Sequence, residues 1–152
     1  MGFLSKGKQT EKAFSKILAN VTFSSETEDI KEHWDLSTNL KIDVKGLKKR
    51  NRSDETVDER IHWVEIKNVN GDLGWLYGDA DYFAFELHNY WVIVDKLDLQ
   101  TLVKTQVKKE YSKIPMLCKL YTREGRKDVI TLISTFDLIN VATAYVKKEL
   151  IY

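Results

Sequence analysis

The sequence predicts an α/β fold in which a mixed central sheet is flanked by helices. Apolar residues recur at helical spacing in 9–21 and again in 98–110, whereas 40–47 and 61–69 alternate apolar with polar residues as strands do. The segment "YWVIVD" at 90–95 is apolar almost throughout, which is typical of a strand buried on both faces. Helices interleaved with strands within 152 residues indicate one α/β domain.

The first half of the chain predicts a helix followed by a strand with one charged face. The apolar residues that share a helical face in 9–21 are Phe14, Ile17, Leu18 and Val21. In "LKIDVKGL" at 40–47 the aliphatic residues alternate with charged ones, so Asp43 and Lys45 should emerge together on the face opposite the core. The segment 48–60 has no periodicity, a basic first half and an acidic second half, and predicts a loop.

The middle of the chain predicts more strands. "IHWVEIKNV" at 61–69 alternates as a third strand, and "NGDLGWLYGDAD" at 70–81 supplies the turn residues after it. The segment "YFAFEL" at 82–87 fits either a short helix or a strand.

The last third predicts two helices separated by a hairpin. The helix over 98–110 is expected to begin at Asp98 as its N-cap. A hairpin should turn at Glu124 and Gly125. The segment "FDLINVATAYVKKELI" at 136–151 predicts a C-terminal helix.

Composition excludes several classes of protein. With a net charge of only +1, a nucleic-acid partner would have to be held by a local basic patch. The single cysteine, Cys118, cannot form an internal disulfide, which favours an intracellular, cytoplasmic protein. We expect no membrane segment, no nucleotide cofactor and no zinc site, because the sequence lacks long apolar runs, glycine-rich phosphate loops and metal-ligand spacing of its histidines.

Two aspartates and a lysine precede a run of cations in "EHWDLSTNLKIDVKGLKKRNR" at 32–52. Hydrolysis of a phosphodiester requires charge neutralisation, a deprotonated water and a stabilised leaving group, and a carboxylate-bound divalent cation serves all three. Magnesium is usually held by one or two carboxylates, which Asp35 and Asp43 would supply. Lys45 would then lie beside the metal, where an ammonium orients the attacking water or stabilises charge on the phosphate.

These residues carry a family resemblance. Asp35, then "IDVK" at 42–45, after a helix that contains Glu11, resembles the PD-(D/E)XK nuclease superfamily, most of all its Holliday junction resolvases and phage-type or restriction-type endonucleases. The resemblance implies a single nuclease domain with a restriction-endonuclease-like core at about 9–110, extended by a hairpin and a helix in 111–152. It also implies a homodimer that acts on DNA and is encoded by a phage or mobile element.

The resemblance assigns roles to individual residues. The residues that it places in the catalytic site are Glu11, Asp35, Asp43, Val44 and Lys45. The two aspartates and the valine carbonyl would hold Mg²⁺ or Mn²⁺, the lysine would be catalytic, and the glutamate would be an accessory acid. Trp34 stands where the family motif has proline.

A second register competes with this one. "WVEIKN" supplies Glu65 and Lys67 as another E-x-K pair, with Asp43 as its upstream aspartate. We prefer Asp35, Asp43 and Lys45, because only the short connection "LSTN" separates Asp35 from the second strand. In that arrangement Glu65 would support the site from the neighbouring strand and Lys67 would contact phosphate.

The basic run suggests how DNA would be held. Its four cations are Lys48, Lys49, Arg50 and Arg52, which would contact phosphates without reading sequence; the alternative is a solvated loop. The sequence therefore predicts a magnesium- or manganese-dependent DNA endonuclease. Such an enzyme could select its substrate by DNA structure, as a junction resolvase does. The alternative is a non-catalytic nucleic-acid-binding or protein-interaction domain on the same fold, and a third interpretation is a small α/β protein with neither role.

Overall fold

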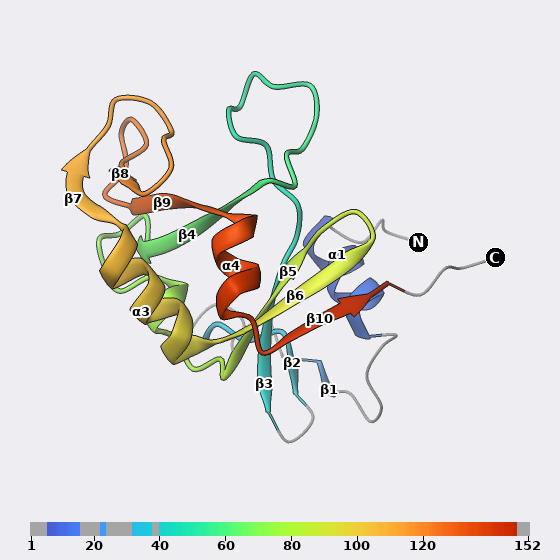
Figure 1. Ribbon diagram of the computed structural model, residues 1–152. Coiled ribbons are helices and arrows are strands. Elements are labelled where there is room, and N and C mark those ends of the chain that lie inside the picture. The colour runs from blue at the N-terminus through green and yellow to red at the C-terminus, as the bar shows by residue number, and fades with distance from the viewer. Residues whose placement is uncertain (1–5, 16–21, 24–31, 38–39, 149–152) are drawn as a thin grey trace, which may run out of the picture.

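The structure is a computed structural model that describes residues 6–15, 22–23, 32–37 and 40–148 (Figure 1). In this part of the chain it contains two mixed sheets, three α-helices and one 3₁₀ helix. The helices are α1 (Lys6–Ser15), η1 (Trp75–Tyr77), α3 (Lys96–Gln106) and α4 (Thr135–Val141). The predicted α/β class with a mixed sheet is confirmed.

The larger sheet has six strands in the order β1-β2-β3-β5-β6-β10. Their bounds are Thr22–Phe23, Leu36–Ser37, Lys41–Lys45, Tyr82–Glu86, Tyr90–Asp95 and Ala144–Lys147. Only β3 and β5 are parallel, with Asp43 opposite Phe83 and Lys45 opposite Phe85. The segment "YFAFEL", open in the sequence, is thus a strand.

The smaller sheet has four strands in the order β4-β9-β8-β7. Their bounds are Ile61–Lys67, Val129–Ser134, Lys119–Tyr121 and Lys108–Tyr111. The predicted hairpin is confirmed: β8 and β9 are antiparallel, and Gly125 in the turn between them has a φ of +73° that glycine adopts without strain.

The two sheets and α3 share one apolar core. Phe83 and Phe85 of β5 pack with Val64 of β4 and Leu99 of α3. Because alternate residues of a strand face opposite sides, Ala84 of β5 points the other way, where it packs with Phe14 of α1. The six-stranded sheet is therefore covered on both faces, by α1 on one and by the smaller sheet with α3 on the other.

The first predicted helix is present, and it begins three residues before the predicted range. The helix α1 begins at Lys6 and is described as far as Ser15, and Phe14 is buried as expected. Ile17, Leu18 and Val21 lie outside the described residues.

Three expectations about the last third are wrong. The helix predicted over 98–110 ends at Gln106, and Lys108–Tyr111 form β7. The N-cap of α3 is Asp95, whose Oδ1 accepts hydrogen bonds from the N–H of Leu97 at 2.8 Å and of Asp98 at 3.3 Å; Asp98 instead lies in the first turn. The predicted helix over 136–151 ends at Val141, and β10 then pairs antiparallel with β6, as Figure 1 shows. The free edge of β6 offers a full ladder of hydrogen bonds, which outweighs helix propensity in "AYVK".

The connection between the parallel strands β3 and β5 runs through the other sheet. Residues 46–81 carry the loop, β4 and η1, and α3 follows β6. This connection places η1 and β4 over the face of β3 that carries Asp43 and Lys45.

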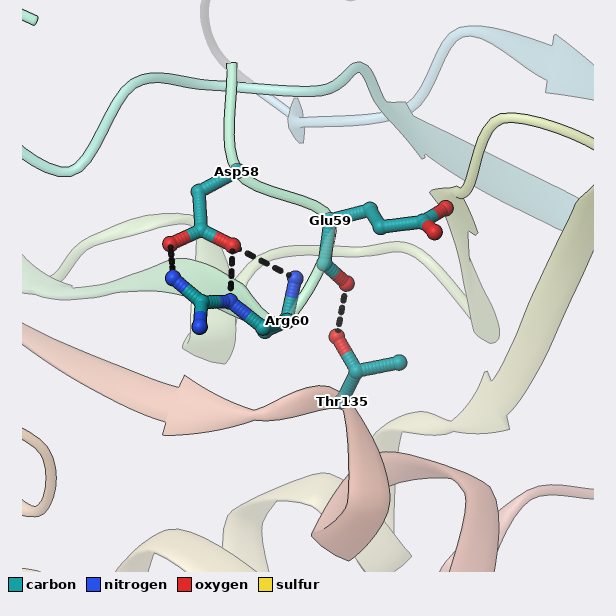
Figure 2. A network of polar contacts seen from close by, with 4 residues as sticks. All are labelled: Asp58, Glu59, Arg60 and Thr135. Carbon is teal, nitrogen blue, oxygen red and sulfur yellow. Dashed lines mark hydrogen bonds and ion pairs between the residues drawn. The ribbon is translucent and has the colours of Figure 1, made fainter. Parts of the chain in front are cut away.

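The end of the charged loop is tied to α4 by the polar network of Figure 2. Asp58 accepts two hydrogen bonds from the guanidinium of Arg60, each 2.9 Å long. The hydroxyl of Thr135 donates to the carbonyl of Glu59, and the N–H of Thr135 donates to the carbonyl of Arg60 at 2.9 Å. The residues just before β4 are therefore anchored to the start of α4.

Candidate active site

Strand β3 brings Asp43 and Lys45 together, as their alternation predicted. Lys45 Nζ lies 2.9 Å from Asp43 Oδ1. The face they share is not a solvated one, however: Asp43 is only 4% exposed. Phe83, its partner on β5, packs against the ring of Trp75 at 5.0 Å between centroids, so η1 covers this face.

Asp35 lies beside β3, directly before β2. Its N–H donates to the carbonyl of Ile42 at 2.8 Å, and its Oδ2 accepts a 2.6 Å hydrogen bond from the N–H of Val44. Trp34, which precedes Asp35, is buried in the main core and holds this segment there. The N–H and C=O of one strand residue point to the same side, so the Val44 carbonyl is directed toward Asp35 as well.

The carboxylates of this cluster influence one another. Burial raises the pKa of Asp43 well above its ordinary value; Lys45 opposes the shift and the charge of Asp35 adds to it. Burial, followed by the charge of Asp35, raises the pKa of Glu11 to about 7, against the lowering effect of Lys8. Asp35 is thus the residue between Glu11 and Asp43.

Two carboxylate oxygens in this cluster have no hydrogen-bond donor among the described residues. They are Oδ2 of Asp43 and Oε2 of Glu11, although the latter lies 3.1 Å from Lys8 Nζ as an ion pair. Leaving a buried anionic oxygen without a donor is costly, and a bound cation would remove that cost.

These residues could supply only part of the ligands of a magnesium ion, and water or substrate oxygens would have to supply the rest. Within the described ranges no group of three or more His, Cys, Asp or Glu side chains is arranged to hold a metal ion. Asp35 and Asp43 supply two carboxylates and Val44 a carbonyl, which matches a hard cation that keeps several water or phosphate oxygens.

Lys45 is held by an aromatic residue from the connection between the parallel strands. Its ammonium lies 4.2 Å from the ring centroid of Trp75, and the N–H of Trp75 donates to Glu65 Oε1 at 3.2 Å. Glu65 therefore supports the site through Trp75. The expectation that Glu65 and Lys67 lie on the strand next to β3 is wrong, because β4 belongs to the smaller sheet, and Lys67 is exposed.

The predicted basic cluster is divided between two places. Lys48 lines the same cavity as Lys45, whereas Arg50 lines a different cavity with Asp58 and Arg60. Lys49 and Arg52 are exposed on the loop.

The cavity at Lys45 has a volume of about 260 Å³ and lies between α1, the end of β3, β4 and η1. The cavity at Arg50 is larger, about 520 Å³, but its walls include Ile61, Leu87 and Phe136, and its Asp58 is already paired with Arg60. We place the candidate site at the smaller cavity, because the carboxylate cluster adjoins it.

Sequence patterns assigned no place in the site to three residues that line this cavity. Lys6 precedes the predicted first helix, Trp75 lies in the turn segment 70–81, and His62 is one residue on the apolar side of a strand. His62 is 3% exposed and its Nε2 has no hydrogen-bond partner among the described residues. The only sign of His62 in the sequence is that a polar histidine occupies a position on the apolar side of the alternating segment 61–69.

No protein-family model matches the chain, and no match was found among curated proteins or among solved structures. None of the helices in the described part of the chain is long and apolar enough to cross a membrane.

Proposed function

We propose that the protein is a Mg²⁺- or Mn²⁺-dependent DNA endonuclease of the PD-(D/E)XK type, with a restriction-endonuclease-like core. The observation that supports this most is the state of Asp43. It is buried, one oxygen pairs with Lys45 at 2.9 Å, and the other has no donor among the described residues while Asp35 lies close enough to raise its pKa. An ion pair with a purely structural role requires neither a second carboxylate nor an unpaired carboxylate oxygen. A site for a divalent cation requires a second carboxylate and oxygens that are free to bind the ion.

Each residue has a role in this proposal. Asp35 and Asp43 hold the cation together with the Val44 carbonyl, and the cation, when bound, activates water and neutralises the phosphate. Lys45 positions the attacking water and stabilises charge on the phosphate. Glu11, with its pKa raised to about 7, is the accessory acid that can exchange a proton near neutral pH.

The DNA backbone is held by cations around this centre. We assign phosphate contacts to Lys48, which lines the cavity with Lys45, and also to Lys49, Arg50 and Arg52 of the loop after β3 and to Lys67 of β4, which lie outside that cavity. A homodimer would present two such centres to the two strands, as expected for an intracellular enzyme of a phage or mobile element that cuts junctions or duplexes.

The test is cleavage of labelled duplex, single-stranded, flap and four-way-junction DNA with Mg²⁺, with Mn²⁺ and with chelator. We expect metal-dependent cleavage that Asp43→Asn and Lys45→Ala each reduce by at least about a hundredfold, since each removes a group that acts on the reacting phosphate. Lys104→Ala, which removes one exposed cation of α3 that lines neither cavity, is the matched control and should cleave normally.

The alternative class is distinguished in the same experiment. DNA binding without cleavage under either metal would favour a non-catalytic binding domain. Cleavage by the Lys45→Ala variant at the wild-type rate would remove this lysine from the site.

A further inference from the structure

A pocket next to the carboxylate cluster has properties that phosphate hydrolysis alone does not require. We call it the lysine–tryptophan pocket and define it by Lys6, Lys45, Lys48, His62, Trp63 and Trp75, which all line the cavity of about 260 Å³. Its residues come from α1, β3, β4 and η1 and the loop after β3, and meet only in the folded chain.

Three lysines converge on this pocket. Partial burial, followed by the positive charges of Lys6 and Lys45, lowers the pKa of Lys48, against the raising effect of the nearby Glu86 carboxylate. The three ammonium groups are therefore within electrostatic reach of one another. Only Lys45 has an acidic partner, Asp43, within ion-pair distance among the described contacts of these three. Cations gathered in this way are stabilised by an anion, and a phosphate is the anion that a nuclease meets.

The remaining walls are aromatic. Trp75 is fixed by Glu65 from below and lies under Lys45, and Trp63 is fixed by a 3.1 Å hydrogen bond from its Nε1 to the carbonyl of Lys49. Both tryptophans are half-buried. The ring of Trp75 already contacts Lys45 and Phe83, and that of Trp63 lies 6.0 Å from the ring of Tyr121, so Trp63 is the ring that we assign to base stacking. Rigid tryptophans beside cations are the combination that binds single-stranded nucleic acid, by base stacking and phosphate contact together.

His62 adds a hydrogen-bonding group that nothing in the described structure uses. It is 3% exposed, lines the pocket, and its Nε2 has no partner among the described residues. Burial lowers the pKa of His62 to about 4, so the ring is neutral at pH 7 and suits a neutral partner such as a base edge. The ring is held by an edge contact with Phe85 at 5.1 Å between centroids.

We infer that the lysine–tryptophan pocket binds one unpaired nucleotide of the DNA strand, adjoining the phosphate that is cleaved. The inference rests on the proposed function for the identity of the polymer as DNA and for the neighbouring cleavage. The volume is slightly below that of pockets for drug-sized ligands, about 300–1,000 Å³, so it admits one base with its phosphate and not a stacked base pair. Substrates with an unpaired segment, such as flaps, splayed ends or junctions, therefore fit this site better than a blunt duplex.

The test measures binding and not cleavage, with Ca²⁺ in place of Mg²⁺. Fluorescence anisotropy would compare a labelled single-stranded oligonucleotide, a blunt duplex of the same sequence and the same duplex with a single-stranded tail. We expect the wild type to bind the single strand and the tailed duplex about tenfold more tightly than the blunt duplex, because a stacked base contributes about that much.

Variants assign the preference to the pocket. Lys48→Ala and Trp63→Leu should each lose most of the tenfold preference, with circular dichroism confirming that both fold, whereas Lys104→Ala should retain it. Equal affinity of the wild type for blunt and tailed duplex, or equal losses in Lys48→Ala and Lys104→Ala, would overturn the inference. If the protein does not cleave DNA in the earlier assay but still prefers single-stranded and tailed DNA, the nuclease proposal is wrong and the pocket inference stands. If it cleaves DNA but shows no such preference, the pocket inference is wrong and the nuclease proposal stands.

Discussion

One carboxylate oxygen of Asp43 pairs with the ammonium of Lys45, and the other has no hydrogen-bond donor among the described residues. Burial of this side chain raises its pKa well above the ordinary value. A cation at this oxygen binds the native chain only, so it must raise the free energy of unfolding. For metal at about ten to a hundred times its Kd, the gain is about 1–3 kcal/mol.

We therefore predict that Mg²⁺ raises the Tm of the wild type and leaves the Tm of Asp43→Asn unchanged. Lys45→Ala, which removes no ligand, should keep the metal-induced rise. Thermal unfolding followed by circular dichroism, with and without chelator, measures this. If Mg²⁺ raises the Tm of Asp43→Asn as much as that of the wild type, the cation does not bind at Asp43.

His62 determines part of the response of the protein to acid. Its pKa is lowered from 6.5 to about 4 by burial, so between these values the unfolded chain binds a proton that the native chain does not. Stability from the neutral ring is fully present above pH 6.5 and is lost as the pH falls toward 4, by roughly 3 kcal/mol at most. Glu11 acts in the opposite direction between pH 7 and 4.5, because its pKa is raised.

Comparing the wild type with His62→Phe isolates the contribution of His62, because Glu11 contributes equally to the stability of both proteins. We predict that, when the pH is lowered from 7 to 4.5, the free energy of unfolding of the variant improves relative to that of the wild type by about 1–3 kcal/mol. Urea unfolding at a series of pH values measures it. A difference that stays constant with pH would mean that the native ring is protonated as easily as the unfolded one.

Among the secondary-structure elements, η1 depends on a glycine. Gly74 begins it, and a Cβ at this position would lie 2.4 Å from the carbonyl oxygen of Glu65, a backbone atom that cannot turn aside. The close approach is what holds Trp75 against β4 and beneath Lys45. At Gly46 the nearest atom to a Cβ would be the hydroxyl of Thr10 at 3.1 Å, on a side chain that can rotate.

We predict that Gly74→Ala lowers the unfolding free energy by about 2 kcal/mol or more, and that Gly46→Ala lowers it by less than about 1 kcal/mol. The tryptophan emission of Gly74→Ala should also shift, since Trp75 must move. Denaturant unfolding and fluorescence spectra of both variants measure these effects. Equal stability of the two variants would show that η1 accommodates the added methyl group.

For the molecule as a whole, the charge distribution limits how the proposed DNA substrate would be bound. A net charge of +1 supplies no attraction at long range, so binding would depend on the few cations near the site. Each phosphate contact contributes a slope of about −0.7 to −0.9 when the logarithm of affinity is plotted against that of salt concentration.

We predict that Lys48→Ala reduces the magnitude of this slope by about 1, while Lys104→Ala leaves it unchanged. Anisotropy titrations at several salt concentrations, with Ca²⁺ present, measure the slope. An identical slope for Lys48→Ala and the wild type would place this lysine away from the backbone of the DNA.

Much of the local structure was predictable because it follows from periodicity. The alternation in 41–45 and 61–67 predicted strands, and the continuous apolar run predicted β6. The pairing of Asp43 with Lys45 on one face follows from the same period of two. Asp95 was missed as a cap because both aspartates precede the apolar pattern of α3 closely enough to start it.

The sequence by itself determined which side chains share a strand face, that β3, β4 and β6 are strands, and that two aspartates and a lysine stand near a basic loop. These properties depend on neighbours along the chain. The tertiary structure alone decided that β10 completes the sheet, that η1 and β4 bury Asp43, and that Lys6, His62 and Trp75 meet Lys48 at one pocket. Such contacts join residues far apart in sequence, and only the packing of a shared core selects among the many ways of bringing them together.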